Sequence, residues 1–308
     1  MDATTTLPVA KPEARWRVGV ALATVYLVWG STYFAIGEAV RTIPPFIMAG
    51  ARFVAAGAVL YAWRRLAGTP RPEKVHWKSA TVISAFLILG GNGFVSWAEQ
   101  RVPSGLAALI ISVTPVVMVV VDWLRPKGTA PGRIVIAGLA VGLVGMAILV
   151  GPARLQAAKN ADAFSTFMCV LAPTLWAIGS IYSRQVRQSP DVLMAAGLQM
   201  LVGSVWLLLA AAITGEFAEF SLGAVTRGSA LAWLYLVLVG AVVGYSAYLY
   251  LLKHTTPAVA TTYAYVNPVV AVFLGWQLGG EIVTGRILFA AALLVGSVVL
   301  ITAFKRKR

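Results

Sequence analysis

One pattern occurs twice in this chain, at a constant separation. Pro115, Trp123 and Gly132 in the first copy correspond to Pro268, Trp276 and Gly285 in the second, and each pair is 153 residues apart. Around the two prolines the strings TPVV and NPVV lie inside long apolar runs. Self-similarity at a fixed period indicates a repeated structural unit, so we predict a fold built from two copies of one unit.

Composition places both copies in a membrane. The 308 residues are 59% hydrophobic and 12% charged, with a mean hydropathy of +0.81, whereas a soluble domain carries about 25% charged residues. A proline deep in a membrane helix frees a backbone carbonyl, which is tolerated only beside protein or a water-filled cavity. Matching breaks in two halves of a membrane protein are a good indication of a transport site. We therefore predict helix breaks or gating positions at Pro115 and Pro268.

Ten apolar runs are long enough for a helix to cross about 30 Å of hydrocarbon. They lie near residues 18–38, 44–65, 77–98, 103–124, 131–151, 162–185, 190–214, 229–252, 257–278 and 284–304. The predicted fold is all-α, a polytopic membrane protein with ten transmembrane helices. Residues 1–17 contain prolines and three cations, and we predict a short disordered cytoplasmic tail and not a cleavable signal peptide. Residues 305–308 form a second short tail.

Lys and Arg are distributed unequally over the loops. Alternate loops carry 18 on the side of both termini and six on the other side, and Arg52 lies within a span. Cytoplasmic loops are the richer in Lys and Arg, so both termini are predicted to face the cytoplasm. Because each copy has an odd number of helices, the copy at 162–304 must be inverted relative to the copy at 18–151, with an extracytoplasmic linker at 152–161. Inverted repeats are the architecture of alternating-access carriers.

Several classes of function are disfavoured by residue content. The net charge of +14 is dispersed over short loops, so it indicates membrane orientation and not nucleic-acid binding. Cys169 lies within an apolar span and is the only cysteine, while His76 and His254 lie at the ends of spans. We therefore expect no disulfide, no metal site, no cofactor and no catalytic pair, and the chain is predicted not to be an enzyme. A channel would need a more continuous polar stripe than this chain contains.

Polar and aromatic side chains recur at spacings that place them on one helix face. In a bilayer such groups normally face protein or water, so we predict that they line a central cavity. The alternative is that the aromatic side chains only pack, or form a belt at the membrane interface. The predicted cavity residues are Trp29, Tyr33, Asn92, Ser96, Trp97, Trp176, Ser180, Tyr245, Tyr248, Tyr263 and Asn267.

Charged residues deep in the membrane are scarce. Glu99 and Glu281 lie at the extracellular ends of spans, and proton coupling through a central carboxylate is disfavoured because no acid lies at mid-depth. Arg52 is the one cation expected to be deep. It either anchors a substrate carboxylate or is a structural cation paired with backbone carbonyls or Glu99. Arg52, Glu99 and Glu281 are therefore possible charge anchors.

The strings WGSTYF, PPFIMAGARF, GNGFVSWAEQRVPSGLAALI and TYAYVNPVVAVFLG, with GGE after the last, resemble the EamA family of the drug/metabolite transporter superfamily. The resemblance extends over nearly the whole chain. It implies ten helices in two inverted five-helix units, with a central cavity between them, as in bacterial inner-membrane exporters. The proline-and-acid pattern of the family falls on Pro268 and Glu281. At the first-half counterpart of Glu281 this chain has Gly128.

These observations together predict a secondary transporter in a bacterial inner membrane. The expected cargo is a small metabolite, with amino acids including aromatic ones favoured, and the alternative is export of drug-like or toxic organic compounds. The helices at 131–151 and 284–304 carry no inward polar residue and are expected to pack or to form a dimer. Small-residue pairs at Gly138/Gly142 and Gly240/Gly244 favour packing within the chain over a homodimer seam, and a monomer is compatible with both.

Overall fold

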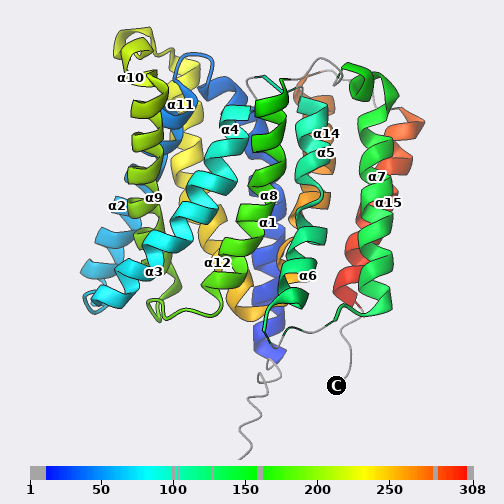
Figure 1. Cartoon of the computed structure of the whole chain (residues 1–308), viewed down its shortest axis with the longest axis horizontal. Coiled ribbons are helices and arrows are strands. Elements are labelled where there is room, and N and C mark those ends of the chain that lie inside the picture. The colour runs from blue at the N-terminus through cyan, green and yellow to red at the C-terminus, as the bar shows by residue number, and fades with distance from the viewer. Residues whose placement is uncertain are drawn as a thin grey trace, which may run out of the picture.

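The computed structural model describes residues 12–98, 101–102, 104–126, 128, 130–157, 162–279 and 284–303. Within these ranges the chain forms a bundle of helices that run side by side (Figure 1). Nine helices of the described residues are long and apolar enough to cross a membrane, and Leu109–Leu124 is a shorter apolar helix. The all-α polytopic fold with ten crossings is thus confirmed.

The crossings of the first repeat follow each other along the chain. They are α1 (Pro12–Ala39), α2 (Pro45–Leu66), α3 (Lys74–Ser84) with η1 (Ala85–Gly93) and α4 (Phe94–Ala98), α5 (Ser104–Ile111) with α6 (Thr114–Leu124), and α7 (Arg133–Ala157). Helix α1 begins at Pro12, so residues 12–17 are helical and the prediction of disorder was wrong for them. Proline is tolerated there because the first turn of a helix needs no backbone donor.

The second repeat has the same sequence of crossings. They are α8 (Ala163–Ser183), α9 (Val192–Thr214), α11 (Arg227–Tyr235) with η4 (Leu236–Tyr245) and α12 (Ser246–His254), α13 (Pro257–Ala260) with α14 (Tyr263–Gly279), and α15 (Gly285–Ala303). The short helices α10 (Glu216–Glu219) and η3 (Leu222–Ala224) lie in the loop between α9 and α11. Asp162 and Asp191 are the N-cap residues of α8 and α9, and their carboxylates accept the backbone N–H of Ser165 and Met194 at 2.7 and 2.9 Å.

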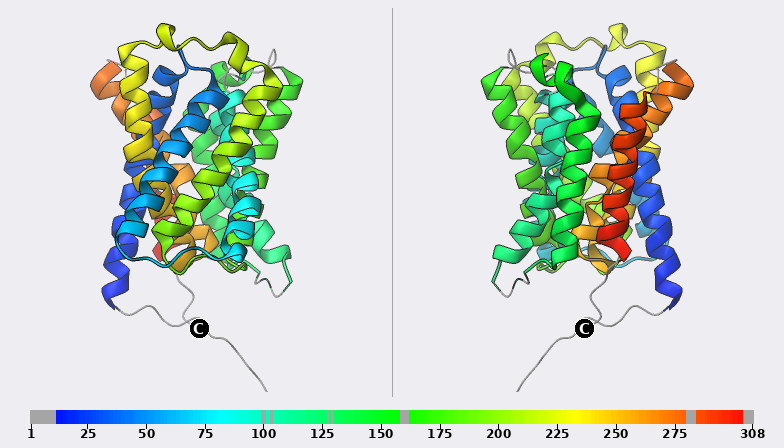
Figure 2. Two further views of the ribbon diagram at one scale, coloured as in Figure 1. Left: turned by 90° about the vertical axis from the view of Figure 1, so that its left-hand side faces the viewer. Right: turned by 90° about the vertical axis from the view of Figure 1, so that its right-hand side faces the viewer.

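The two repeats pack against each other through equivalent helices. Helix α1 begins and α15 ends on the same side of the bundle, which we call the terminus side, and the opposite side is the loop side (Figure 1). The second crossings, α2 and α9, lie side by side, and the fifth crossings, α7 and α15, pair at the opposite edge (Figure 2). A Cβ on Gly57 of α2 would lie only 2.8 Å from the backbone N of Leu201 in α9, so these backbones need glycine to approach so closely.

The small-residue pairs of the sequence are used for packing inside the chain. A Cβ on Gly138 would lie 2.8 Å from Ile301 of α15, and one on Gly142 would lie 2.5 Å from Tyr265 of α14. Gly240 and Gly244 face α1. These glycine pairs therefore allow neighbouring helices of the same chain to pack closely.

The third crossing of each repeat is π-helical in its middle, a feature that the sequence analysis did not predict. Segment η1 extends over 9 residues and η4 over 10, at equivalent positions of the two repeats. A π-helical segment widens the backbone spiral and leaves backbone groups with altered partners, and such segments are frequent at functional sites. The repeat relation therefore extends to the details of the backbone.

The fourth crossing of each repeat is broken, and hydroxyl side chains fill the break. In the first repeat, Ser112 and Thr114 donate to the carbonyls of Leu109 and Ile111 at 2.7 and 2.5 Å. Pro115 follows in the first turn of α6, as predicted.

In the second repeat the break lies at Thr261 and Thr262, whose hydroxyls donate to the carbonyls of Pro257 and Val259 at 2.9 and 2.7 Å. Pro268 lies inside the continuous helix α14, so the predicted position of this break was wrong. The helix is interrupted at Thr261 and Thr262 instead, more than one turn before the proline, and side-chain hydroxyls that bond to nearby backbone carbonyls favour such a bend.

Candidate functional site

A cavity of about 130 Å³ lies between the two repeats. A single buried water needs roughly 10–15 Å³ on the same measure, so the cavity has room for several waters or a small molecule. Its walls come from α1, α2, η1, α4, α5 and α6 of the first repeat and from α8, η4 and α14 of the second. Nine of the residues predicted from sequence line it: Trp29, Tyr33, Arg52, Asn92, Ser96, Trp176, Tyr245, Tyr263 and Asn267.

Four aromatic rings form a cluster at one end of the cavity. We call Trp29, Trp176, Tyr248 and Tyr263 the aromatic partition. The Trp29 ring lies 4.8 Å from Tyr263, 5.2 Å from Tyr248 and 5.7 Å from Trp176, measured between ring centroids. Aromatic pairs at such spacings contribute about 0.5–1.5 kcal/mol each beyond their buried area. Because Trp29 belongs to the first repeat and the other three to the second, the partition joins the repeats.

Hydrogen bonds fix the rings of the partition. Trp176 Nε1 donates to the hydroxyl of Tyr248 at 2.8 Å, and that hydroxyl also lies 2.7 Å from Ser180 Oγ. Ser180 in turn donates to the carbonyl of Trp176 at 2.7 Å. Tyr248 and Ser180 are completely buried. Neither lines the cavity, and both instead support its wall from behind.

A second cavity of about 300 Å³ lies on the far side of the partition. Along α8, Trp176 of the partition lines the first cavity, Ser180 supports the partition through Tyr248, and Ser183 and the adjoining Arg184 line the second cavity. Along η4 and α12 the same order is Tyr245, Tyr248 and Leu252. The partition therefore separates a cavity among the spans from one near the terminus side.

The second cavity has a polar wall. Lys253 Nζ donates to the carbonyl of Pro190 at 3.1 Å, and Arg184 donates to the carbonyls of Leu252 and Thr255. Burial lowers the pKa of Arg184 below its ordinary value. Both cations thus hold the end of α12 against the loop before α9.

Arg52 is the charged side chain of the first cavity. It is 5% exposed, and its Nη2 donates to Asn92 Oδ1 at 3.0 Å. Its Cζ lies 4.3 Å from the centroid of the Phe53 ring. Asn267, on the opposite repeat, is 2% exposed, and its Oδ1 is buried with no hydrogen-bond partner in the described part of the chain. The lining thus offers a guanidinium, two amides and several hydroxyls in a wall that is largely apolar and aromatic.

Glycines make room for the two tryptophans of the partition. A Cβ on Gly91 of η1 would lie 2.4 Å from Trp176 Cε3, and one on Gly244 of η4 would lie 2.6 Å from Trp29 Nε1. Trp29 Nε1 also donates to the carbonyl of Gly240 at 3.2 Å. In each π-helical segment a glycine therefore lets the ring of one tryptophan pack directly against the helix backbone.

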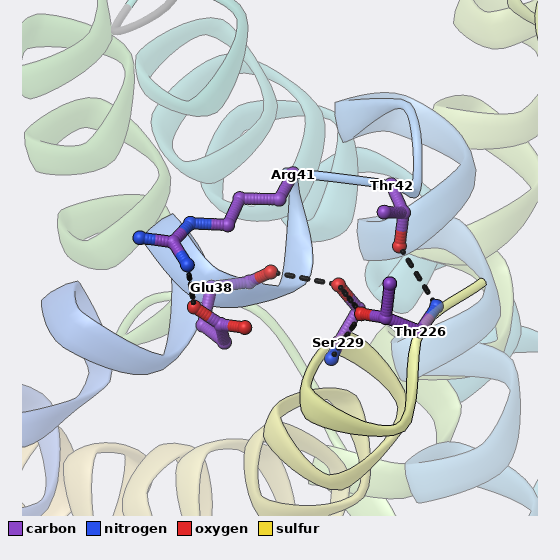
Figure 3. Close-up of polar contacts among 5 residues, drawn as sticks. All are labelled: Glu38, Arg41, Thr42, Thr226 and Ser229. Carbon is purple, nitrogen blue, oxygen red and sulfur yellow. Dashed lines mark hydrogen bonds and ion pairs between the residues drawn. The ribbon is translucent and has the colours of Figure 1, made fainter. Parts of the chain in front are cut away.

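On the loop side, polar contacts tie the first repeat to the second (Figure 3). Ser229 of α11 donates from Oγ to the carbonyl of Glu38 at 2.9 Å, and Thr226 donates from its backbone N to Thr42 Oγ1 at 3.4 Å. Arg41 forms an ion pair with Glu38 at 2.8 Å. These contacts join the end of α1 to the start of α11.

A buried carboxylate makes a further contact between the repeats on this side. Glu216 of α10 is 7% exposed and accepts the backbone N–H of Phe46 at 3.2 Å and of Ile47 at 2.9 Å. These are donors of the first turn of α2, where negative charge is favoured by the helix dipole. Burial raises the pKa of Glu216, and the two backbone hydrogen bonds lower it by less.

Other predicted site residues lie elsewhere. Trp97 does not line the cavity: its ring packs 5.8 Å from Phe164, and Arg101 lies 4.9 Å from its centroid, at the loop-side end of α4. Glu99 and Glu281 lie outside the described residues.

Sequence reasoning missed part of the lining. The missed residues are Thr32, Ile36, Phe53, Leu87, Ile88, Gly91, Val95, Ile111, Thr114, Ala172, Pro173 and Gly240. Two of them could have been found from the sequence, because Phe53 follows Arg52 directly and Pro173 is a third proline deep in a span, after Pro115 and Pro268. The aliphatic lining residues could not be found from the sequence, because aliphatic side chains that face a cavity and those that face the core have the same periodicity.

Comparison with known proteins agrees with the repeat. The EamA-like transporter family matches residues 17–151 and again residues 163–303. The inner membrane transporter YedA of Escherichia coli K12 is 38% identical over 287 residues, which cover 92% of this chain and 90% of that protein. The transporter YoaV of Bacillus subtilis is 25% identical over 95% of this chain and 99% of its own length. One solved structure has a TM-score of 0.74 against this chain at 20% sequence identity. The match covers 94% of this chain and 99% of that structure, so the two share the fold.

Proposed function

The chain belongs to the EamA-like transporter family, and from this premise we propose that it exports small amphipathic metabolites, with amino acids including aromatic ones as the favoured cargo. The observation that carries the proposal is the cavity between the repeats, which has aromatic walls, two amides and a guanidinium. Trp29, Trp176 and Tyr263 offer rings against which an apolar or aromatic body can stack. Asn92, Ser96 and Asn267 offer neutral donors and acceptors for polar groups. The same residue types make up small-molecule sites in general.

In this mechanism the two repeats rock about the cavity. The aromatic partition seals the cavity from the terminus side in the present conformation, and breaking the Trp176–Tyr248–Ser180 hydrogen bonds opens it. The loop-side contacts of Ser229 and Glu216 then hold the other side closed. The broken fourth crossings and the π-helical third crossings are the hinges that take up the change. Transport needs no bond chemistry, and we assign no enzymatic role.

The orientation follows from the loop charges. Eighteen of the 25 Lys and Arg residues belong to the terminus side, and this bias favours a cytoplasmic location for it. The host membrane is then a bacterial inner membrane, as for the relative YedA. Export begins with loading from the second cavity and ends with release on the loop side.

Export of drug-like or toxic organic compounds is the second candidate. The specific observation in its favour is the aromatic partition, because ring faces also attract organic cations. The two candidates differ in the charge of the cargo. A panel that contains both amino acids and organic cations therefore distinguishes the two candidates.

The test is counterflow in proteoliposomes with labelled phenylalanine, threonine and methionine. We expect protein-dependent flux, with phenylalanine the best of the three because of the aromatic walls. Absence of flux for every amino acid in the panel rejects amino acids as the cargo class. Flux of organic cations in place of amino acids favours the second candidate.

A matched pair of variants ties the flux to the cavity. Asn267→Ala removes an amide that faces the cavity, and the loss of one hydrogen bond, about 0.5–1.5 kcal/mol, raises the half-saturating concentration about 2- to 10-fold. Phe34→Ala is the control, because Phe34 is 73% exposed on the outer surface of α1. Equal effects of both variants would contradict the assignment of the cavity.

A further inference from the structure

The charge of Arg52 is not balanced within the described part of the chain. The ion pairs there use Arg41, Arg64, Arg125 and Arg187, and none uses Arg52. Among the described residues its guanidinium contacts the neutral amide of Asn92 and the ring of Phe53. Its Nε is buried and has no acceptor among the described residues. A guanidinium has five N–H donors, so most of its capacity is unused here.

A buried cation without a counter-charge is costly, because neither an amide nor a ring face neutralises it. Arg52 is 5% exposed, and that exposure is toward the cavity that it lines. Asn92 accepts from Nη2 and also lines the cavity, so it holds the planar fork at the wall. The fork of a guanidinium matches the two oxygens of a carboxylate. Among the described residues nothing supplies an anion for this fork, and an anion bound in the cavity would supply it.

The rest of the wall offers no comparable binding site for a cationic ligand. No Asp or Glu is among the described lining residues, whose polar members besides Arg52 are hydroxyls and amides. A ligand ammonium would meet Asn267 as a neutral acceptor, and it would be repelled by the guanidinium in a low-dielectric site. The ring faces of Trp29 and Trp176 attract the ammonium group of such a ligand through cation–π interactions. This attraction is opposed by the charge of Arg52 within the same small cavity.

We propose that Arg52, held by Asn92, is an anion subsite, and that the cargo of this carrier is defined by a carboxylate joined to an apolar or aromatic body. The amino group of an amino acid is then dispensable, and amines that lack the carboxylate are rejected. This inference rests on the proposed transport function and names its substrate class. It also separates the two candidate functions, because organic cations are poor ligands of such a site.

The test compares three ligands with the same ring on the full-length purified chain. They are L-phenylalanine, 3-phenylpropionate, which has only the carboxylate, and 2-phenylethylamine, which has only the amine. Isothermal titration calorimetry measures their affinities. We expect phenylalanine and 3-phenylpropionate to bind within about tenfold of each other, and the amine to bind at least tenfold more weakly than 3-phenylpropionate. An amine that binds as tightly as the carboxylate, or absence of binding by 3-phenylpropionate, overturns the anion subsite.

Variants assign the preference to Arg52. Arg52→Gln keeps hydrogen-bond donors but removes the charge, and we expect the ratio of the 3-phenylpropionate to the amine affinity to fall at least tenfold. A purely structural role would weaken all three ligands alike and leave that ratio unchanged. Arg41→Gln is the matched control, because its side chain is 72% exposed and pairs with Glu38 on the loop side. If Arg52→Gln does not fold, the ligand series on the native chain still decides the question.

The outcomes for binding and for transport are independent. Binding of 3-phenylpropionate without flux of any amino acid in proteoliposomes supports the subsite and contradicts the proposed amino-acid export. Flux of phenylalanine together with tight binding of 2-phenylethylamine supports transport and contradicts the subsite.

Discussion

At the scale of single residues, the hydroxyl of Tyr248 is the junction of the aromatic partition. It receives the indole N–H of Trp176 and lies within hydrogen-bond distance of Ser180. All three groups are buried, so no water replaces a lost partner. The partition is therefore sensitive to the removal of one oxygen atom.

Tyr248→Phe tests this sensitivity. The change leaves Trp176 Nε1 without its acceptor, and an unsatisfied buried donor costs about 1–3 kcal/mol. We expect a loss of that size in the free energy of unfolding, measured with a chemical denaturant in detergent. Tyr250→Phe on the same helix is the control, since the Tyr250 ring is half-buried and stacks on His254 at 4.0 Å. Its effect is expected within about 0.5 kcal/mol. Equal losses in both variants would show that the junction adds no stability.

Several polar residues that the sequence places at mid-depth lie at the cavity, and their role in binding stays a prediction. Asn92, Asn267, Trp176 and Arg52 line the cavity because buried polar groups in a membrane protein face protein or water. The sequence analysis did not distinguish a residue at the cavity surface from one a turn behind it, as with Tyr248. Helical spacing gives the face of a helix, but the depth behind that face depends on how neighbouring helices tilt and pack.

At the scale of elements, the π-helical segments set the width of the site. Segments η1 and η4 place Gly91 and Gly244 against the two tryptophans of the partition. Neither segment has a sequence signal beyond its glycines, and glycine in a membrane helix has several other uses. The register shift of a π-helix is decided by tertiary packing, which explains why the sequence did not predict it.

Gly91→Ala tests the close approach of η1 to Trp176. The added methyl group would lie 2.4 Å from Trp176 Cε3, so the ring or the helix must move. We expect transport to fall at least tenfold and the free energy of unfolding to fall by about 1–3 kcal/mol, the usual cost of overpacking. Gly37→Ala is the control, because nothing lies within 4 Å of a Cβ there. It should be neutral or slightly stabilising, since alanine is the better helix former. Normal flux in Gly91→Ala would contradict the tight fit.

Glu216 predicts a pH dependence of the contact between α10 and α2. Because burial raises its pKa in the folded chain above the usual value near 4.5, the folded state holds the proton more tightly than the unfolded state. The unfolded chain then binds fewer protons, so the free energy of unfolding falls as pH rises from about 4.5 through the raised pKa. Below that window the contribution is fully present.

The measurement is a thermal unfolding series between pH 4 and pH 8, with Glu216→Gln beside the native chain. The variant keeps an acceptor for the N–H of Ile47 but has no proton to release. We expect the native chain to lose stability relative to the variant as pH rises. A native chain that gains stability relative to the variant over this range would show that the two backbone hydrogen bonds outweigh burial.

At the scale of the whole molecule, the arrangement in two inverted repeats is predicted by the sequence alone. The 153-residue shift, the odd number of crossings and the loop charges predicted two inverted copies of one five-helix unit, whereas the pairing of equivalent helices is a finding of the structure. The fourth crossings are where the symmetry is least strict. Their breaks lie at Ser112–Thr114 and at Thr261–Thr262, which are not 153 residues apart, and at each break hydroxyl side chains donate to nearby backbone carbonyls.

That asymmetry affects how the molecule works. Thr262 at the second break also contacts the hydroxyl of Tyr26 at 2.6 Å, which joins α14 to α1 close to the partition. The first break lies instead at Thr114 on the cavity wall. We therefore expect the two repeats to move differently and the two sides of the cavity to open by different routes.

The most direct measurement of alternating access is cysteine labelling on both sides of the partition. In a Cys169→Ala background, Ser96→Cys reports the first cavity and Leu252→Cys reports the second. A membrane-impermeant thiol reagent is applied from each side of the membrane, with and without phenylalanine. We predict that phenylalanine changes the two labelling rates in opposite directions, because one cavity closes as the other opens. Rates that rise together, or that do not respond to the ligand, would contradict a carrier built on two rocking repeats.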